Sequence, residues 1–277
     1  MISLQAQFVQ NSINRSIIVD SHCHLDLVEA KGENIDEIIA KAKQNNVEIL
    51  QTICTRISKI DEILKYGKKY ENVFASVGNH PCNVDEEPRI KAADIIEICN
   101  NNKKIIGIGE TGLDYFHKSA AVENQKESFL EHIQAAQILQ KPLIIHSRDC
   151  DKDMIEILES EQKNKKFPAL LHCFSSSQAL AHKALDLGIY ISLSGIVTFK
   201  NAQDLQKTAK DVPLNMMLVE TDSPYFAPIP HRGKSNQPAF TRHVVEFIAE
   251  LKGLEWQEVA RQTTQNFLQV FGFNAES

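Results

Sequence analysis

The sequence of 277 residues lacks several features that would place it at a membrane or outside the cell. No apolar run approaches the roughly 20 residues needed to cross a bilayer. The first 16 residues have neither the charged nor the apolar region of a signal peptide. Six cysteines stand singly, without a CxxC pair, which favours reduced thiols packed as small core residues. We expect a soluble, cytoplasmic protein without membrane contact.

Excess positive charge is also absent. The formal net charge is -6 and the pI about 5.9, so the chain lacks the overall basic field that attracts duplex nucleic acid. This makes a dedicated DNA-binding module less expected. A nucleic-acid enzyme is not excluded, because bound divalent metals add local positive charge that a residue count omits. Nothing in the sequence indicates an obligatory protein partner.

What the sequence does contain is an alternation of short apolar runs with amphipathic stretches, the pattern of repeated βα units. Eight such repeats predict an α/β fold, a (β/α)8 TIM barrel, within its usual length of about 250 residues. A doubly wound open sheet is the alternative, but no GxGxxG follows an early strand. The expected strands cover residues 16–21, 47–54, 73–78, 104–109, 142–147, 169–174, 189–194 and 216–221.

The two ends of the chain extend this pattern. Residues 241–271 predict two extra C-terminal helices with Gly253 as a C-cap between them. Residues 1–15 form an N-terminal arm without an assigned role. No linker, repeat or low-complexity tract interrupts the remainder, so residues 16–277 are predicted to form a single domain.

Six side chains that commonly bind metals lie at or near the ends of the expected strands. Singly, a strand histidine is more often a satisfied core residue, and a carboxylate after a strand is often a helix N-cap. In a barrel, however, the carboxyl ends of the strands converge on the face that carries the active site. The set therefore predicts a metal centre, with the ligands His22, His24, Glu110, His146, His172 and Asp222.

The first two ligands form an HxH pair. In extended chain, His22 and His24 point to the same side and can bind one ion. Asp20, two residues earlier on the same face, is a further candidate ligand or an acceptor for an imidazole N–H.

Six protein ligands exceed the number that one open catalytic zinc site uses. We therefore expect two divalent cations, with Glu110 as the natural bridging carboxylate. Imidazole and carboxylate donors suit zinc or manganese better than magnesium, which remains a third candidate. Two metals about 4 Å apart can activate water and stabilise both oxygens of an in-line displacement. This combination predicts hydrolytic chemistry.

Seven sequence blocks, in order from about Ile17 to Phe271, resemble the signature of the TatD family of metal-dependent deoxyribonucleases. Seven blocks in register are far more specific than the HxH pair alone. Cys82 is a departure, because many relatives have a histidine or another polar residue there. The blocks are DSHCHLD (20–26), GNHP (78–81), GETGLDY (109–115), PLIIHSRD (142–149), HCFS (172–175), ETDSPYFAP (220–228) and RGKSNQP (232–238).

The resemblance implies a TIM-barrel hydrolase of the amidohydrolase-like superfamily that cleaves DNA phosphodiester bonds, often as a 3′-5′ exonuclease acting on single strands or ends. On the family pattern, Asp222 is also the expected general base. One metal would be held by His22, His24, Glu110 and Asp222, and the other by Glu110, His146 and His172.

Several further residues are candidates for contact with the substrate. His80 and Arg148 are candidates for phosphate contact, although Arg148 could instead pair with Asp149 or Asp151. Tyr115 and Phe116 could stack on a base or belong to the core. Arg232, Lys234 and Asn236 lie in a loop that could form a basic lip for nucleic acid or merely be solvated.

Two other functions remain open. The same centre could hydrolyse a small ester, amide or phosphoester, or a D-aminoacyl-tRNA, because the fold does not fix the substrate. Alternatively, the protein could be a binding or scaffold protein whose metal site is structural and closed to water.

Overall fold

The computed structural model describes residues 15–273, so almost all of the predicted N-terminal arm lies outside the described residues. Eight strands form one sheet in chain order from β1 to β8, as expected for a (β/α)8 fold. By its internal contacts the chain divides into two compact units, with boundaries after Leu50 and after Ile191. These boundaries fall inside two strands, and the single domain over residues 16–277 stays a prediction.

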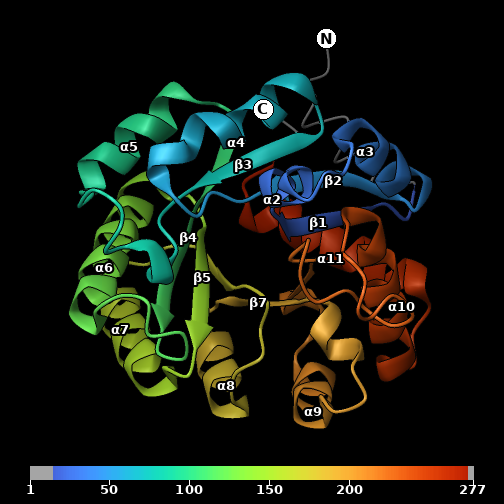
Figure 1. The fold of residues 1–277 in the computed structure, drawn as a ribbon. Coiled ribbons are helices and arrows are strands. Elements are labelled where there is room, and N and C mark those ends of the chain that lie inside the picture. Colours follow the sequence, from blue (N-terminus) through green and yellow to red (C-terminus); the bar gives the residue numbers. More distant parts are fainter. Residues whose placement is uncertain (1–14, 274–277) are drawn as a thin grey trace. The chain divides into compact units, whose positions relative to one another are not determined.

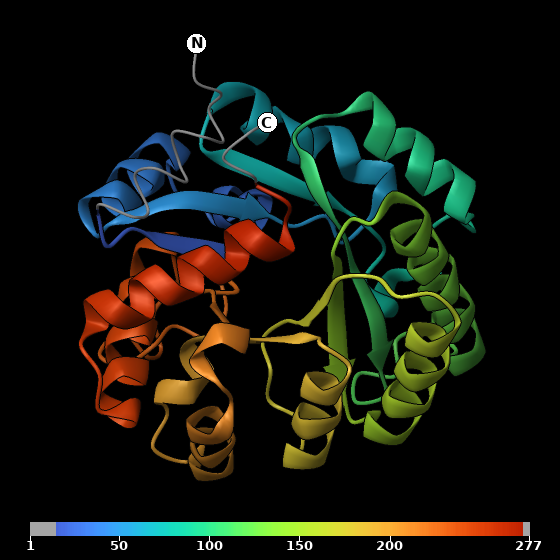
Figure 2. The same cartoon turned by 180° about the vertical axis from the view of Figure 1, so that it is seen from behind.

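The first unit contains both ends of the described chain. Helices α10 and α11 pack against each other and against β1, and Figure 2 shows the red helix α11 beside the dark blue strand. Gly253, with a φ of 67°, ends α10, which confirms the predicted C-cap. The elements are β1 (Ile18–Cys23), α2 (Leu25–Ala30), α3 (Ile35–Gln44), η3 (Gly195–Thr198), α9 (Gln203–Asp211), η4 (Leu214–Met216), β8 (Met217–Val219), η5 (Pro238–Phe240), α10 (Thr241–Lys252) and α11 (Trp256–Val270).

The second unit is a run of βα repeats in which α5, α6 and α7 pack on β3, β4 and β5 (Figure 1). Strands β2 and β7 cross the boundaries between the units. The elements are β2 (Val47–Thr52), η1 (Ile57–Lys59), α4 (Ile60–Lys69), β3 (Val73–Val77), η2 (Pro81–Asn83), α5 (Ala92–Asn101), β4 (Ile105–Asp114), α6 (Val122–Leu139), β5 (Leu143–Arg148), α7 (Asp151–Asn164), β6 (Ala169–Leu171), α8 (Gln178–Asp186) and β7 (Tyr190–Leu193).

Several strand limits differ from the prediction, and those of β4 and β6 change the places of expected ligands. Strand β4 continues to Asp114 because its second half pairs in parallel with β5, so Glu110 lies within the strand rather than after it. Strand β6 ends at Leu171, and Cys173 has a φ of 42°, a left-handed conformation that cannot continue a strand. His172 therefore follows its strand instead of lying inside it.

Strand burial agrees with the near-continuous apolar runs of the sequence. All six residues of β1 and all ten of β4 are buried, as expected for parallel strands covered by helices. Four of the six cysteines, Cys23, Cys54, Cys99 and Cys150, are buried as well, in keeping with small core residues. Between residues 15 and 273, no helix combines the length and apolar character that a membrane span requires.

Candidate metal centre

The first ligand group consists of His22, His24 and Asp222. His22 lies in β1 and His24 directly follows the strand. The backbone N–H of Asp222 donates to the carbonyl of His22, and the N–H of His24 donates to that of Ser223, each at 2.8 Å. A parallel bridge between Cys23 and Ser223 joins the same two segments. These contacts bring together residues from the two ends of the sequence.

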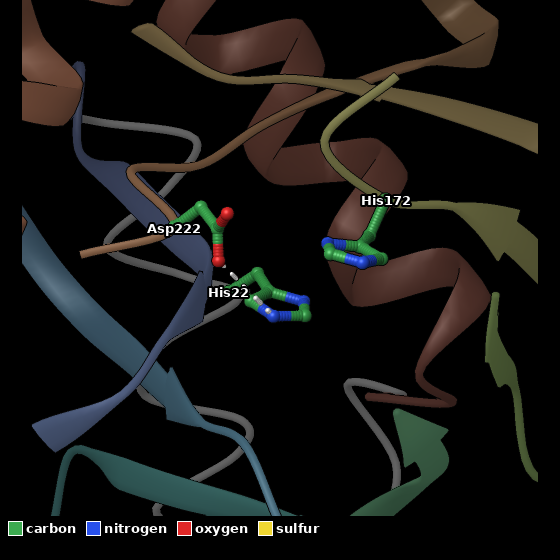
Figure 3. Close-up of side chains that lie close together, drawn as sticks. All are labelled: His22, His172 and Asp222. Carbon is green, nitrogen blue, oxygen red and sulfur yellow. Dashed lines mark ion pairs between the residues drawn. The ribbon is translucent and has the colours of Figure 1, made fainter. Parts of the chain in front are cut away.

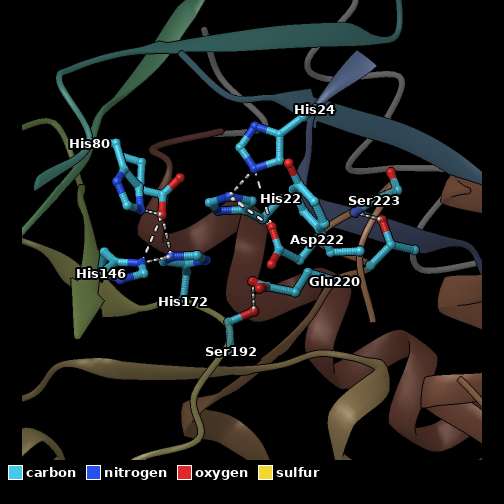
Figure 4. Close-up of polar contacts among 12 residues, drawn as sticks. His22, His24, His80, His146, His172, Ser192, Glu220, Asp222 and Ser223 are labelled. Atoms are coloured by element: carbon cyan, nitrogen blue, oxygen red, sulfur yellow. Dashed lines mark hydrogen bonds and ion pairs between the residues drawn. The ribbon is translucent and has the colours of Figure 1, made fainter. Parts of the chain in front are cut away.

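The polar atoms of this group converge closely. Nε2 of His22 lies 3.3 Å from Nε2 of His24, and Nε2 of His24 lies 3.2 Å from Oδ1 of Asp222 (Figure 4). Nε2 of His22 is 3.6 Å from the same carboxylate oxygen, and Figure 3 shows this pair. Two ligands of a tetrahedral zinc ion, each 2.0–2.1 Å from the metal, are about 3.3 Å apart. The group therefore fits one ion.

Asp20 stabilises the backbone that carries this group, and none of its described hydrogen bonds is to an imidazole. Its carboxylate accepts hydrogen bonds from the backbone N–H of Thr221 at 2.9 Å, the Thr221 hydroxyl at 2.6 Å and the backbone N–H of His22 at 3.3 Å. Burial raises the pKa of Asp20 to about 8 against the effect of these donors. Asp20 therefore joins the backbones of β1 and the segment after β8. The expected hydrogen bond from an imidazole is not among the described contacts, and the role of Asp20 as a ligand stays a prediction.

The second ligand group consists of Glu110 from β4, His146 from β5 and His172 after β6, and His80 from the loop after β3 lies beside it. Oε1 of Glu110 lies 2.7 Å from Nε2 of His172, 3.0 Å from Nδ1 of His146 and 3.3 Å from Nε2 of His80. The two nitrogens of His146 and His172 are 3.3 Å apart (Figure 4). Three imidazoles thus surround one carboxylate oxygen, a donor set that fits a divalent metal.

The side chain of Glu110 is held in its negatively charged form. Burial acts to raise the pKa of its carboxyl group, but the imidazoles of His172, His80 and His146 outweigh burial and hold that pKa well below the ordinary value. Burial lowers the pKa of His80 despite the nearby carboxylate. The group therefore presents an ionised carboxylate among imidazoles, the protonation state that metal binding requires of the carboxylate.

Asp114, which the sequence analysis did not single out, orients His146. Its Oδ2 atom lies 3.0 Å from Nε2 of His146 and 2.8 Å from Nδ1 of His117. A carboxylate on the far nitrogen of a ligating imidazole fixes its orientation and raises its basicity. The signal was the spacing within GETGLDY, because Asp114 lies four residues after Glu110 and so on the same face of an extended strand.

His80 was predicted to contact phosphate, and the structure places it directly beside Glu110. The turn that carries it is held by His132 of α6, a buried residue that the sequence analysis missed. Nε2 of His132 accepts the backbone N–H of Asn79 at 3.2 Å, while its Nδ1 lies 2.7 Å from the carbonyl of Ser128. Both contacts are satisfied by a neutral ring with its hydrogen on Nδ1.

The burial of His132 predicts a loss of stability in acid. Desolvation lowers its pKa from 6.5 to about 4. Between these values the unfolded chain binds a proton that the folded protein excludes, so stability falls as the pH falls. From pH 7 to pH 5 this residue should remove about 2 kcal/mol of unfolding free energy. Urea unfolding at both pH values should show a smaller acid loss for His132→Gln than for the wild type.

The exposed residue His182 offers the control for this measurement. The variant His182→Gln should keep the full acid loss of the wild type. An equal acid loss in His132→Gln would contradict the buried, neutral state of His132.

Arg148, the last residue of β5, lies beside Phe116. The guanidinium carbon of Arg148 is 4.9 Å from the ring centre of Phe116, which is 54% exposed. Nη1 of Arg148 donates to Oγ of Ser175 at 3.5 Å, and no ion pair to Asp149 or Asp151 forms among the described residues. The salt bridge considered as an alternative is therefore not present.

The hydroxyl of Tyr115 forms a hydrogen bond within the protein. Its hydroxyl donates to Oδ2 of Asp153 at 2.6 Å. Burial raises the pKa of the Tyr115 hydroxyl, and the carboxylate of Asp153 raises it further. The ring is only partly buried, so the expected contact with a base stays a prediction.

The three residues of the predicted basic lip differ in their exposure to solvent. Arg232 and Lys234 are exposed, and the guanidinium carbon of Arg232 lies 4.3 Å from the ring centre of Phe199. Asn236 is instead buried, and its amide donates to the carbonyls of Thr221 at 2.9 Å and Tyr225 at 2.6 Å. Because its donor groups are used inside the protein, Asn236 holds the loop in place rather than lining an exposed lip.

Comparison with known proteins identifies the family. The family described as TatD related DNase matches residues 19–272. The chain is 42% identical over 260 residues to the uncharacterized metal-dependent hydrolase YcfH of Escherichia coli K12, with 93% of this chain and 97% of that protein covered. It is 33% identical over 258 residues to the uncharacterized metal-dependent hydrolase YabD of Bacillus subtilis, with 93% and 100% covered.

Solved structures confirm the fold class. The TatD homolog YjjV of Escherichia coli matches with a TM-score of 0.85 at 24% identity, covering 92% of this chain and 98% of that one. A hydrolase of the TatD family from Entamoeba histolytica matches with a TM-score of 0.80 at 18% identity, covering 92% and 97%. The predicted (β/α)8 TIM barrel is thus confirmed, and the chain belongs to the TatD family of metal-dependent hydrolases.

Proposed function

We propose that this metal-dependent hydrolase cleaves phosphodiester bonds of DNA and releases nucleotides from single-stranded ends with 3′-5′ polarity. The observation that carries the proposal is the pair of ligand groups, because each gathers imidazoles and a carboxylate at the spacing of metal ligands. Membership in a family described as TatD related DNase supplies DNA as the substrate class.

Two divalent cations, zinc, manganese or magnesium, are the proposed cofactors. His22, His24 and Asp222 would hold one, His146 and His172 the other, and Glu110 would be shared by both. When bound, such cations lower the pKa of water and offset the negative charge of the phosphodiester. The imidazole-rich donor set favours zinc or manganese over magnesium.

Asp222 is the proposed general base. Its Oδ1 atom lies 3.2 Å from His24 and 3.6 Å from His22, which keeps the carboxylate in one orientation. A carboxylate has a second oxygen, and an oriented carboxylate can take a proton from attacking water. Its position, three residues after the end of β8, is one at which this fold commonly places catalytic residues.

Arg148 and Phe116 are the proposed contacts for the nucleotide. Arg148 makes no ion pair within the described chain, and its guanidinium offers a fork that matches the oxygens of a phosphate. The exposed ring of Phe116 beside it can stack on a base. His80, next to Glu110, keeps its proposed contact with phosphate, and the exposed Arg232 and Lys234 keep theirs with the strand.

The test is nucleotide release from a 3′-labelled and a 5′-labelled single-stranded oligonucleotide by purified, metal-loaded protein. We expect stepwise shortening from the 3′ end, and loss of this activity in Asp222→Asn, with an unchanged circular dichroism spectrum. Nucleotide release that persists in Asp222→Asn would overturn the assignment of the base.

A substrate panel separates the other functions. If the oligonucleotide remains intact while a small ester, amide or phosphoester, or a D-aminoacyl-tRNA, is hydrolysed, DNA is the wrong substrate and the metal centre is retained. If the metal-loaded protein hydrolyses nothing, the site is structural.

A further inference from the structure

Outside the two ligand groups, another pair of imidazoles lies close together in the first unit, with ring centres 4.9 Å apart and ring planes tilted by 48°. His231 belongs to the loop after β8, and His243 lies in the first turn of α10. Their Nε2 atoms are 3.1 Å apart. Neither residue contacts the first ligand group in the described contacts, and no role in the proposed hydrolysis uses them.

We propose that His231 and His243 bind a divalent transition metal ion of the zinc class through their Nε2 atoms. The proposal goes beyond the proposed function and does not depend on it. The site would fasten the loop 229–237 to α10, and that loop carries the exposed Arg232 and Lys234.

The distance between the Nε2 atoms of His231 and His243 matches that between two ligands of one zinc ion. Two imidazoles bound to one tetrahedral zinc ion place their ligating nitrogens about 3.3 Å apart. The observed 3.1 Å is close to this value, so very little movement is needed to bind an ion. The ring of His231 is also held in place, because it stacks on Phe240 with 3.9 Å between ring centres and an angle of 3°.

The other ring nitrogen of His243, Nδ1, faces a carboxylate. Its Nδ1 atom lies 3.3 Å from Oε2 of Glu246, one turn further along α10. A carboxylate on the far nitrogen is the usual partner of a metal-bound imidazole, and it directs the Nε2 lone pair toward the ion. Glu246 also accepts from Nε of Arg242 at 2.8 Å, which fixes the position of the carboxylate.

The charge state and accessibility of the pair agree with this role. Partial burial, then the neighbouring His243 and Lys234, lower the pKa of His231, so its ring is neutral at neutral pH and its lone pair is available. The side chain of His243 is 30% exposed, so an ion can enter from solvent. Two protein ligands leave positions for water or for an anion.

Zinc stoichiometry tests the proposal. The intact protein is dialysed against buffered free zinc at about ten micromolar, and bound zinc is measured by elemental analysis. We expect the wild type and the control His182→Asn, which removes an exposed histidine of α8, to bind one equivalent more than His231→Asn or His243→Asn. The extra equivalent should persist in Asp222→Asn, which separates it from the proposed catalytic ions.

Two further measurements make the test decisive. Glu246→Gln keeps both imidazoles and should weaken the extra equivalent by about 10- to 100-fold. Cobalt should give a visible absorption band that is reduced in His231→Asn relative to the wild type and His182→Asn. Equal zinc stoichiometry in all of these variants would overturn the proposal and leave a simple hydrogen bond between the two histidines.

Discussion

Replacing Glu110 by glutamine is expected to reduce nucleotide release by about 10 000-fold, the scale of loss when one member of a catalytic unit is removed. Three imidazole nitrogens lie within 3.3 Å of its Oε1 atom. Glutamine keeps the size of the side chain but removes the negative charge that faces these rings. We therefore expect metal content to fall together with activity.

The control for this variant is Glu97→Gln, which changes an exposed carboxylate of α5 in the same way. Elemental analysis and the oligonucleotide assay should both leave Glu97→Gln at the level of the wild type. A Glu110→Gln protein that retains its metals and hydrolyses DNA normally would contradict the central position of Glu110. Retained metals with lost activity would instead restrict Glu110 to the chemical step.

The expected ligands could be predicted from sequence because strand ends converge in a barrel. His22 and His24 combine an HxH pattern with a preceding apolar run, and period-two alternation places both rings on one side. Asp222 follows the last apolar run, and the structure brings its carboxylate within 3.2 Å of His24. No register or loop geometry was needed for that inference.

Residues that act through backbone contacts could not be predicted in the same way. His132 lies in the middle of an amphipathic helix, where a histidine gives no sign of the turn it holds. Asn236 lies in a polar loop next to basic residues, and only the fold shows that its amide is buried against two carbonyls. His80 had a recognisable motif, but its closeness to Glu110 depends on the path of the loop after β3.

The positions of the strands could be predicted from the sequence, but the residues at which some of them end could not. Apolar runs locate all eight strands, but β4 extends through GETGLD because Thr111 to Asp114 pair with β5, and pairing is not visible in one strand alone. The short β6 ends where the backbone at Cys173 turns left-handed. In both cases neighbouring strands and loops, rather than local composition, decide where the strand ends.

Gly112 connects this pairing to the metal centre. It is the register partner of His146, and its φ of 140° is one that other residues rarely adopt. A Cβ atom on Gly112 would lie 2.1 Å from the carbonyl oxygen of His146. The overlap is with backbone, so an alanine can be accommodated only if β4 and β5 separate where His146 and Glu110 are held.

The variant Gly112→Ala is therefore expected to lose about 4 kcal/mol of unfolding free energy or more, roughly a 10 °C fall in melting temperature. Its metal content should also fall, because the separation of the strands moves His146 away from Glu110. Gly188→Ala is the matched control: Gly188 also has a positive φ, of 76°, but nothing lies within 4 Å of its added Cβ atom. Backbone strain alone should cost that variant about 1 kcal/mol. If thermal unfolding shows equal losses for the two variants, the close approach of β4 to β5 does not constrain Gly112.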